Sequence, residues 1–241
     1  MPVCQYASVP VCQCANSFRL LLPPSALKQY DVPTWGLLPA ICYPLPAKKT
    51  RKMNEQFLKD SIRLFKYYKH LGEGAMDQVN DEQLFVSPDS ASNSMAVMVK
   101  HLWGNMLSRW TDFLTTDGEK DFRKRDEEFV SDQQTRAELY ARWEEGWACL
   151  FDTLESLSPD DMSKTVYIRN QGHAVSEAIQ RQIAHYSYHV GQLVFLAKQM
   201  QGDNWNSLSI PKNQSSAFNE KHFDSPKGPR HFTDDFLEKN S

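Results

Sequence analysis

The sequence predicts an all-α protein, a four-helix bundle preceded by an irregular N-terminal extension. Two observations predict this fold. After residue 53, four long segments repeat apolar side chains at helical spacing. The segments between them are charged or contain Pro and Gly, and none is convincing as part of a β-sheet. A bundle is the usual way for four amphipathic helices to bury their apolar faces against one another.

The first 52 residues differ in kind from the rest of the chain. They carry six Lys or Arg and a single acidic residue, although the whole chain has a net charge of −3. They also hold eight of the thirteen prolines, and Pro23-Pro24 interrupts the longest apolar piece. No secretory signal or membrane span is recognisable there. We expect residues 1–52 to be an irregular or disordered leader, or upstream sequence translated from a start codon placed too early, with Met53 as the natural first residue.

Cysteine usage gives an alternative for this leader. Four of the five cysteines lie in it, at Cys4, Cys12, Cys14 and Cys42. A disulfide or zinc knot is conceivable, but no CxxC pair and no nearby histidine support it. The only later cysteine, Cys149, lies in a helix rich in aromatic residues, where we expect it to be part of the core. A single such cysteine fits a reducing compartment, so we expect a cytoplasmic protein.

The first two predicted helices follow Met53. The first covers about residues 54–80, and Gly72 and Gly74 indicate a potential kink in it. A loop over 81–92 follows. The second helix begins near Ser92–Asn93, which are good N-caps, and continues to about residue 114.

The other two helices complete the bundle. A charged connection, 115–132, is long enough to carry the chain along the bundle as a crossover. The third helix covers about 133–157, and the fourth covers about 173–201 after a short extended segment at 165–169. We place the bundle domain at 53–223 and a polar tail at 224–241, with a short helix near 233–239.

Two histidines in the last predicted helix raise the question of function. His185 and His189 lie four residues apart in 182-QIAHYSYHVGQ-192 and therefore project from one helix face. Such a pair can grip one metal ion, but it can equally be a pair of hydrogen-bonded core or surface histidines. Tyr186 and Tyr188 lie beside this face, and we expect both to serve packing.

A third histidine strengthens the metal interpretation. His101 is the only histidine of the second helix and lies between apolar neighbours. Three histidines from two helices would hold an ion and leave positions open for water or substrate. His173 is too far along its helix to join them, so we expect it to cap the helix or line an entrance. Asn105, Arg181 and Gln182 are candidate substrate-pocket residues.

Other metal and nucleotide motifs are missing from the sequence. No Glu is followed by a His three residues later, as a di-iron bundle requires, and HExxH does not occur. The weakly acidic charge gives no reason to expect nucleic acid or a membrane as partners. A small-molecule substrate is the expected partner.

From Met53 to about Phe223 the sequence resembles the DinB-like (damage-inducible) superfamily of metalloenzymes, and more narrowly its uncharacterised bacterial branch related to bacillithiol-dependent transferases. The segments 100–120, 170–198 and 208–219 carry this resemblance in family order. The resemblance implies an up-down-down-up four-helix bundle, commonly a homodimer. It also implies a metal site made of one His from the second helix and two from the last, which are His101, His185 and His189 here.

The resemblance further implies a reaction. Relatives use zinc or another divalent ion, such as nickel or iron, to bind a low-molecular-weight thiol such as bacillithiol and to transfer it to an electrophile. Metal coordination lowers the pKa of a thiol, so the chemistry is coherent. We therefore expect a metal-dependent thiol transferase. The alternative is a non-catalytic, stress-related helical dimer that binds a metal or a small ligand.

Overall fold

The computed structural model describes residues 47–237, except residues 131 and 133. Most of the expected leader, with its four cysteines, lies outside the described residues. Residues 47–52, which the sequence analysis placed in the leader, instead form the start of the first helix. The segment 47-AKKTRK-52 contains good helix formers and follows the last proline of the N-terminal region, which explains the earlier start.

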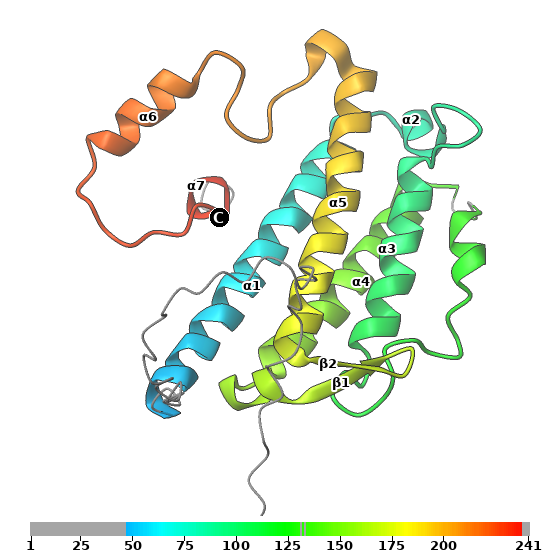
Figure 1. Cartoon of the computed structure of the whole chain (residues 1–241). Coiled ribbons are helices and arrows are strands. Elements are labelled where there is room, and N and C mark those ends of the chain that lie inside the picture. Colours follow the sequence, from blue (N-terminus) through cyan, green and yellow to red (C-terminus); the bar gives the residue numbers. More distant parts are fainter. Residues whose placement is uncertain (1–46, 131, 133, 238–241) are drawn as a thin grey trace, which may run out of the picture. The chain divides into compact units, whose positions relative to one another are not determined.

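The described part of the chain is mostly helical (Figure 1). Its α-helices are α1 (Ala47–Met76), α2 (Asp81–Phe85), α3 (Met95–Trp110), α4 (Arg136–Ser156), α5 (Val175–Gln201), α6 (Ser215–Phe223) and α7 (Asp234–Leu237). Its short 3-10 helices are η1 (Arg125–Phe129), η2 (Pro159–Ser163) and η3 (Gly202–Asn204). Its strands are β1 (Thr165–Ile168) and β2 (Gln171–Ala174).

The four long helices α1, α3, α4 and α5 match the four predicted helical segments and pack along one another (Figure 1). Helix α1 packs on α5 and α3 packs on α4, and contacts between α3 and α5 and between α1 and α4 join the two pairs. This arrangement brings a face of α3 against a face of α5, where the candidate histidines lie.

Aromatic side chains from all four long helices meet in the core. Phe65 of α1 contacts Trp110, Trp147 and Tyr186, at ring-centroid distances of 6.2, 6.3 and 5.8 Å. The Trp110 indole donates a hydrogen bond to the Tyr186 hydroxyl at 3.1 Å, and that hydroxyl donates to Asn105 Oδ1 at 3.0 Å. Buried aromatic residues contribute much of the energy of a core, and these bonds satisfy their polar ends. The core thereby fixes α3 relative to α5 next to the histidines.

The helix ends are set by local hydrogen bonds that shift the predicted boundaries. Ser94, rather than Ser92 or Asn93, caps α3 by accepting the Val97 N–H at 3.2 Å. Thr135 and Glu138 form a capping box at the start of α4, three residues after the predicted start. Each cap satisfies N–H groups that the first helical turn leaves free.

Helix α1 continues as a single helix through Gly72 and Gly74. The glycines serve close packing. A Cβ atom at position 72 would lie 2.5 Å from Cη2 of Trp143, and one at position 74 would lie 2.7 Å from a methyl group of Leu208. Gly72 therefore allows the Trp143 ring of α4 to lie directly on α1.

No sheet was predicted from the sequence, and this prediction is wrong for one small hairpin. Strands β1 and β2 pair antiparallel, with Ile168 opposite Gln171. Arg169 and Asn170 form the two-residue turn with φ of 55° and 60°, as a type I′ turn requires. Asp117 accepts both of their backbone N–H groups at 2.8 Å, which compensates for the lack of a glycine in the turn.

The fourth predicted helix begins later than expected because β2 takes its first residues. His173 is in the strand, and α5 begins at Val175 after Ala174, which offers no side-chain cap. The tail contains the expected short helix as α7. A further helix that was not predicted, α6, ends just before the tail, within the predicted bundle domain. Among the described helices, none is long and apolar enough to cross a bilayer.

Candidate metal centre

His101, His185 and His189 lie together between α3 and α5. Each offers one ring nitrogen, and these atoms lie within 4.8 Å of one another. The Nε2 atoms of His101 and His185 are 3.3 Å apart. Spacing of four residues along α5 places His185 and His189 one turn apart, and their ring centroids are 4.8 Å apart. The three histidines that the sequence analysis selected are thus brought together.

The nitrogen spacing suits a metal ion. Two nitrogen ligands of a tetrahedral zinc ion, each about 2.0–2.1 Å from it, lie about 3.3 Å apart. The His101–His185 distance has this value, although a hydrogen bond between two imidazoles fits it as well. The cluster could therefore hold a divalent ion.

Both histidines of α5 are held in the neutral form that a metal ligand needs. Burial, followed by the positive charges that His189 and His101 can carry, lowers the pKa of His185 to about 3. Burial and the His101 charge lower the pKa of His189 to about 4, against a hydrogen bond with Gln192 that raises it. Neutral imidazole has a free lone pair for an ion at neutral pH.

Glu128 orients His101 and was missed by the sequence analysis. His101 Nδ1–H donates to Glu128 Oε2 at 2.8 Å, so the Nε2 lone pair faces the other two histidines. A carboxylate behind a histidine ligand is a common arrangement in metal sites, where it fixes the tautomer. Burial raises the pKa of Glu128, but hydrogen bonds from His101 and Arg123 outweigh this effect and lower it, which keeps the carboxylate charged.

Glu128 can reach His101 because Gly104 of α3 has no side chain at the point where Glu128 approaches the helix. Glu128 belongs to η1, within the charged connection that was predicted only as a crossover. A Cβ atom on Gly104, almost one turn after His101, would lie 2.5 Å from Glu128 Oε1. An isolated glycine within a helix, Gly104, is the sequence signal that could have indicated this close approach.

Two further contacts position the histidine rings. His189 Nδ1 lies 2.9 Å from Gln192 Oε1, one turn further along α5, which leaves its Nε2 free as in His101. The Phe129 ring stacks on His101 with centroids 5.2 Å apart, so η1 covers one side of the cluster. The rings are thus oriented from α3, α5 and η1 together.

The histidines open into a pocket of about 440 Å³. Asn105, Arg181 and Gln182, the candidate pocket residues from the sequence, line it with them. Asn105 is tied to the core through its bond from Tyr186. Gln182 is 3% exposed, and its Oε1 has no hydrogen-bond partner among the described residues. A larger cavity of about 860 Å³ lies at the tail beside Tyr67 and α7, away from this cluster.

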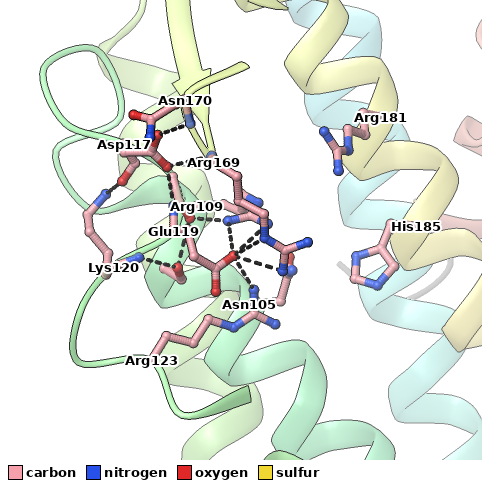
Figure 2. A network of polar contacts seen from close by, with 12 residues as sticks. Asn105, Arg109, Asp117, Glu119, Lys120, Arg123, Arg169, Asn170, Arg181 and His185 are labelled. Atoms are coloured by element: carbon pink, nitrogen blue, oxygen red, sulfur yellow. Dashed lines mark hydrogen bonds and ion pairs between the residues drawn. The ribbon is translucent and has the colours of Figure 1, made fainter. Parts of the chain in front are cut away.

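The pocket also contains arginines that the sequence analysis did not single out. Arg109, Arg123, Arg125 and Arg169 line it together with Arg181. They come from α3, the connection after it, η1 and the β1–β2 turn. Figure 2 shows Arg109, Arg123 and Arg169 around Glu119, with Arg181 and His185 extending from α5 on the other side. No periodic pattern in the sequence relates such scattered positions.

The remaining candidates take other places. His173 does not cap α5; its Nδ1 lies 2.9 Å from Glu177 Oε1 and its Nε2 lies 3.4 Å from Arg181. Tyr186 is fully buried, as a packing role requires, whereas Tyr188 is 64% exposed, so its expected packing role is wrong. Cys149 is half-buried against the core, close to its expected place.

Fold and site together define a mostly helical protein with a three-histidine cluster that could hold a metal ion. The model of the family described as "Protein of unknown function (DUF1572)" matches residues 52–214, more than half of the chain. The chain belongs to this family, which is part of the DinB-like superfamily. Comparison with curated proteins and with solved structures gave no significant match. The resemblance to the superfamily is confirmed, and the narrower relation to bacillithiol-dependent transferases stays a prediction.

Proposed function

We propose that this protein is a divalent-metal-dependent enzyme in which His101, His185 and His189 hold the ion. The observation that carries the proposal is the convergence of three imidazole nitrogens in the lining of one pocket. Structural zinc sites usually have four protein ligands, whereas catalytic sites keep one position for water or substrate. In the described part of the chain the cluster contains these three residues only, which favours an open site.

Imidazole ligands suit zinc, nickel and iron, and zinc is our first choice. We further propose that the four long helices form the up-down-down-up bundle of the DinB-like superfamily and that the protein is a homodimer. The resemblance to that superfamily supports both statements.

The reaction we propose is transfer of a low-molecular-weight thiol, such as bacillithiol, to an electrophilic small molecule. The bound ion would lower the pKa of the thiol and so supply thiolate at neutral pH. The sulfur forms a bond to the electrophilic carbon, the leaving group departs with its electron pair, and the thiol proton passes to solvent. Glu128 and Gln192 keep the histidine rings in place, and the pocket walls hold the electrophile.

A screen with metal-reconstituted protein tests this proposal. Bacillithiol, glutathione and cysteine are each paired with alkyl halide electrophiles, and conjugates are measured by mass spectrometry. We expect one thiol to be conjugated faster than in buffer and this acceleration to be lost in His189→Ala. Metal binding without turnover of any pair would contradict thiol transfer and favour the alternative, a non-catalytic protein that binds a metal or a small ligand.

A further inference from the structure

The pocket above the histidines has a strong excess of positive side chains. Five arginines line it, and none of its described lining residues is acidic. The arginines come from four separate parts of the chain, since Arg123 and Arg125 share the connection after α3, so no single helix face explains their gathering. They are Arg109, Arg123, Arg125, Arg169 and Arg181.

Carboxylates behind the lining compensate only part of this charge. Glu119 Oε2 accepts from Arg109 at 3.3 Å and from Arg169 at 3.1 Å, and it lies 3.5 Å from Arg123. A single carboxylate oxygen therefore serves three guanidinium groups (Figure 2). Glu128 is shared between Arg123 and His101.

Two other nearby acids, Asp117 and Asp126, add little. Asp117 accepts the backbone N–H groups of Glu119, Arg169 and Asn170, so backbone donors surround its carboxylate. Asp126 lies 4.0 Å from Arg125 and is fully exposed, where an ion pair is weak.

Two buried polar atoms in the lining have no partner among the described residues. They are Nε of Arg109, whose side chain is 6% exposed, and Oε1 of Gln182, which is 3% exposed. Burial and the charge of Arg123 lower the pKa of Arg109, against the effect of Glu119. A buried cation with a free donor gains most from an added anion, because unpaired buried polar groups are unfavourable.

Two of the arginines are exposed at the pocket and only loosely held. Arg181 lies one turn before His185 on α5, and its closest described polar contact is His173 Nε2 at 3.4 Å. Arg125 lies over the Phe129 ring, 5.2 Å from its centroid. Arg109, Arg123 and Arg169 have a structural role, because they hold the η1 connection and the β-hairpin in place. Arg125 and Arg181 have no such role.

We infer that this pocket binds a small molecule through an oxyanion group, a carboxylate or a phosphate, with the guanidinium groups as its binding subsite. Guanidinium groups match both oxyanions with paired, charge-assisted hydrogen bonds. The inference rests on the proposed function in one respect: the three histidines line the same pocket, so an ion held by them would be available to the reacting part of the same molecule.

Isothermal titration calorimetry tests this inference. Orthophosphate, pyrophosphate and succinate are each titrated into the full-length protein, once without metal and once loaded with zinc. We expect at least one oxyanion to bind with one site per chain, and the phosphate and succinate arms identify which oxyanion class is preferred. Arg181→Gln and Arg125→Gln should each weaken binding about tenfold, because each removes a charge-assisted contact. In ¹⁵N-labelled wild type the Nε–H signal of Arg109 should shift during the same titration, a readout that needs no variant.

Arg63→Gln is the matched control, since Arg63 is an exposed arginine of α1 in a loose ion pair with Asp234 at 3.9 Å. It should leave the affinity unchanged. The inference is wrong if none of the three oxyanions binds, or if Arg63→Gln weakens binding as much as the pocket variants do. The two proposals can fail separately. Oxyanion binding by a protein that takes up no metal supports the oxyanion subsite and contradicts the metal site. Metal uptake by a protein that binds no oxyanion contradicts the subsite and leaves the metal site standing.

Discussion

At the scale of single residues, the site depends on how each histidine ring is held. His101 is buried, its Nδ1 is occupied by Glu128, and its Nε2 is left for the other two histidines. Glu128 in turn accepts from Arg123 at 2.8 and 3.0 Å, so a chain of charged contacts runs from the surface connection to the candidate ligand. Such outer contacts tune metal affinity in many sites.

Glu128→Gln should weaken binding of zinc about 10- to 100-fold, because the amide is a poorer acceptor for His101 Nδ1–H and no longer fixes the tautomer. Competition with a chromophoric chelator measures this affinity. Glu127→Gln is the control, since Glu127 is an exposed neighbour that pairs only with Lys124 at 3.3 Å among the described contacts. Equal affinities of Glu128→Gln and wild type would show that Glu128 does not support the ligand.

The metal-free protein should become less stable as the pH is lowered. The pKa values of His185 and His189 are about 3 and about 4 in the folded protein, below the ordinary 6.5 that they regain on unfolding. Between these values the unfolded chain binds more protons, so the free energy of unfolding decreases as pH falls from about 6.5 towards 4. Urea titrations at several pH values measure the slope, which should be shallower in His185→Gln/His189→Gln.

The ligand residues were predictable and their supporting residues were not. The spacing of His185 and His189 needs only a regular helix, and His101 was marked by its apolar neighbours. Glu128, Arg123 and the other arginines lie in the connection, the turn and separate helices, so only the folded chain brings them to the histidines.

At the scale of elements, glycines allow neighbouring helices to approach one another closely. Gly72 of α1 lies under the Trp143 ring of α4, and Gly146 of α4 lies close to α3, where an added Cβ atom would lie 3.0 Å from the sulfur of Met106. Both glycines occur within helices, where glycine is intrinsically unfavourable, so their contacts with the neighbouring helix offset that preference.

Gly72→Ala should destabilise the protein by about 1–3 kcal/mol, because the new methyl group overlaps the Trp143 ring. Gly191→Ala on α5 should instead stabilise it by about 0.5–1 kcal/mol, because nothing lies within 4 Å of the added atom and alanine favours helices. Chemical denaturation of both variants measures the two changes. The packing account is contradicted if the two substitutions have the same sign.

The sequence predicted the existence of the long helices better than their ends. Apolar spacing over many turns is a strong signal, so all four appear in the structure. Ends depend on single hydrogen bonds, such as the cap at Ser94, which several neighbouring serines and asparagines could have made. The hairpin was missed because its turn, Arg169–Asn170, lacks glycine and depends on Asp117, far away in sequence.

At the scale of the whole molecule, a bound ion would join α3 to α5 close to the aromatic core. His101 belongs to α3, and His185 and His189 belong to α5, so coordination would couple two helices that already meet through Trp110 and Tyr186. A ligand that binds only the folded state stabilises that state.

Zinc at about 100 times its dissociation constant should therefore raise the free energy of unfolding by about 2.7 kcal/mol and increase the melting temperature. Differential scanning calorimetry with and without chelator measures this shift. His189→Ala should show little or none of it, while keeping a cooperative transition. A shift of wild-type size in His189→Ala would place the stabilising ion elsewhere.

The central claim is that three histidines form one metal site, and metal stoichiometry tests it most directly. Wild type, His101→Ala, His185→Ala, His189→Ala and the control His70→Ala, which changes a histidine of α1 outside the cluster, are saturated with zinc, desalted and analysed by elemental mass spectrometry. We predict about one ion per chain in wild type and His70→Ala, and far less in the other three variants. Full metal content in any of those three variants, or none in wild type, would contradict the account.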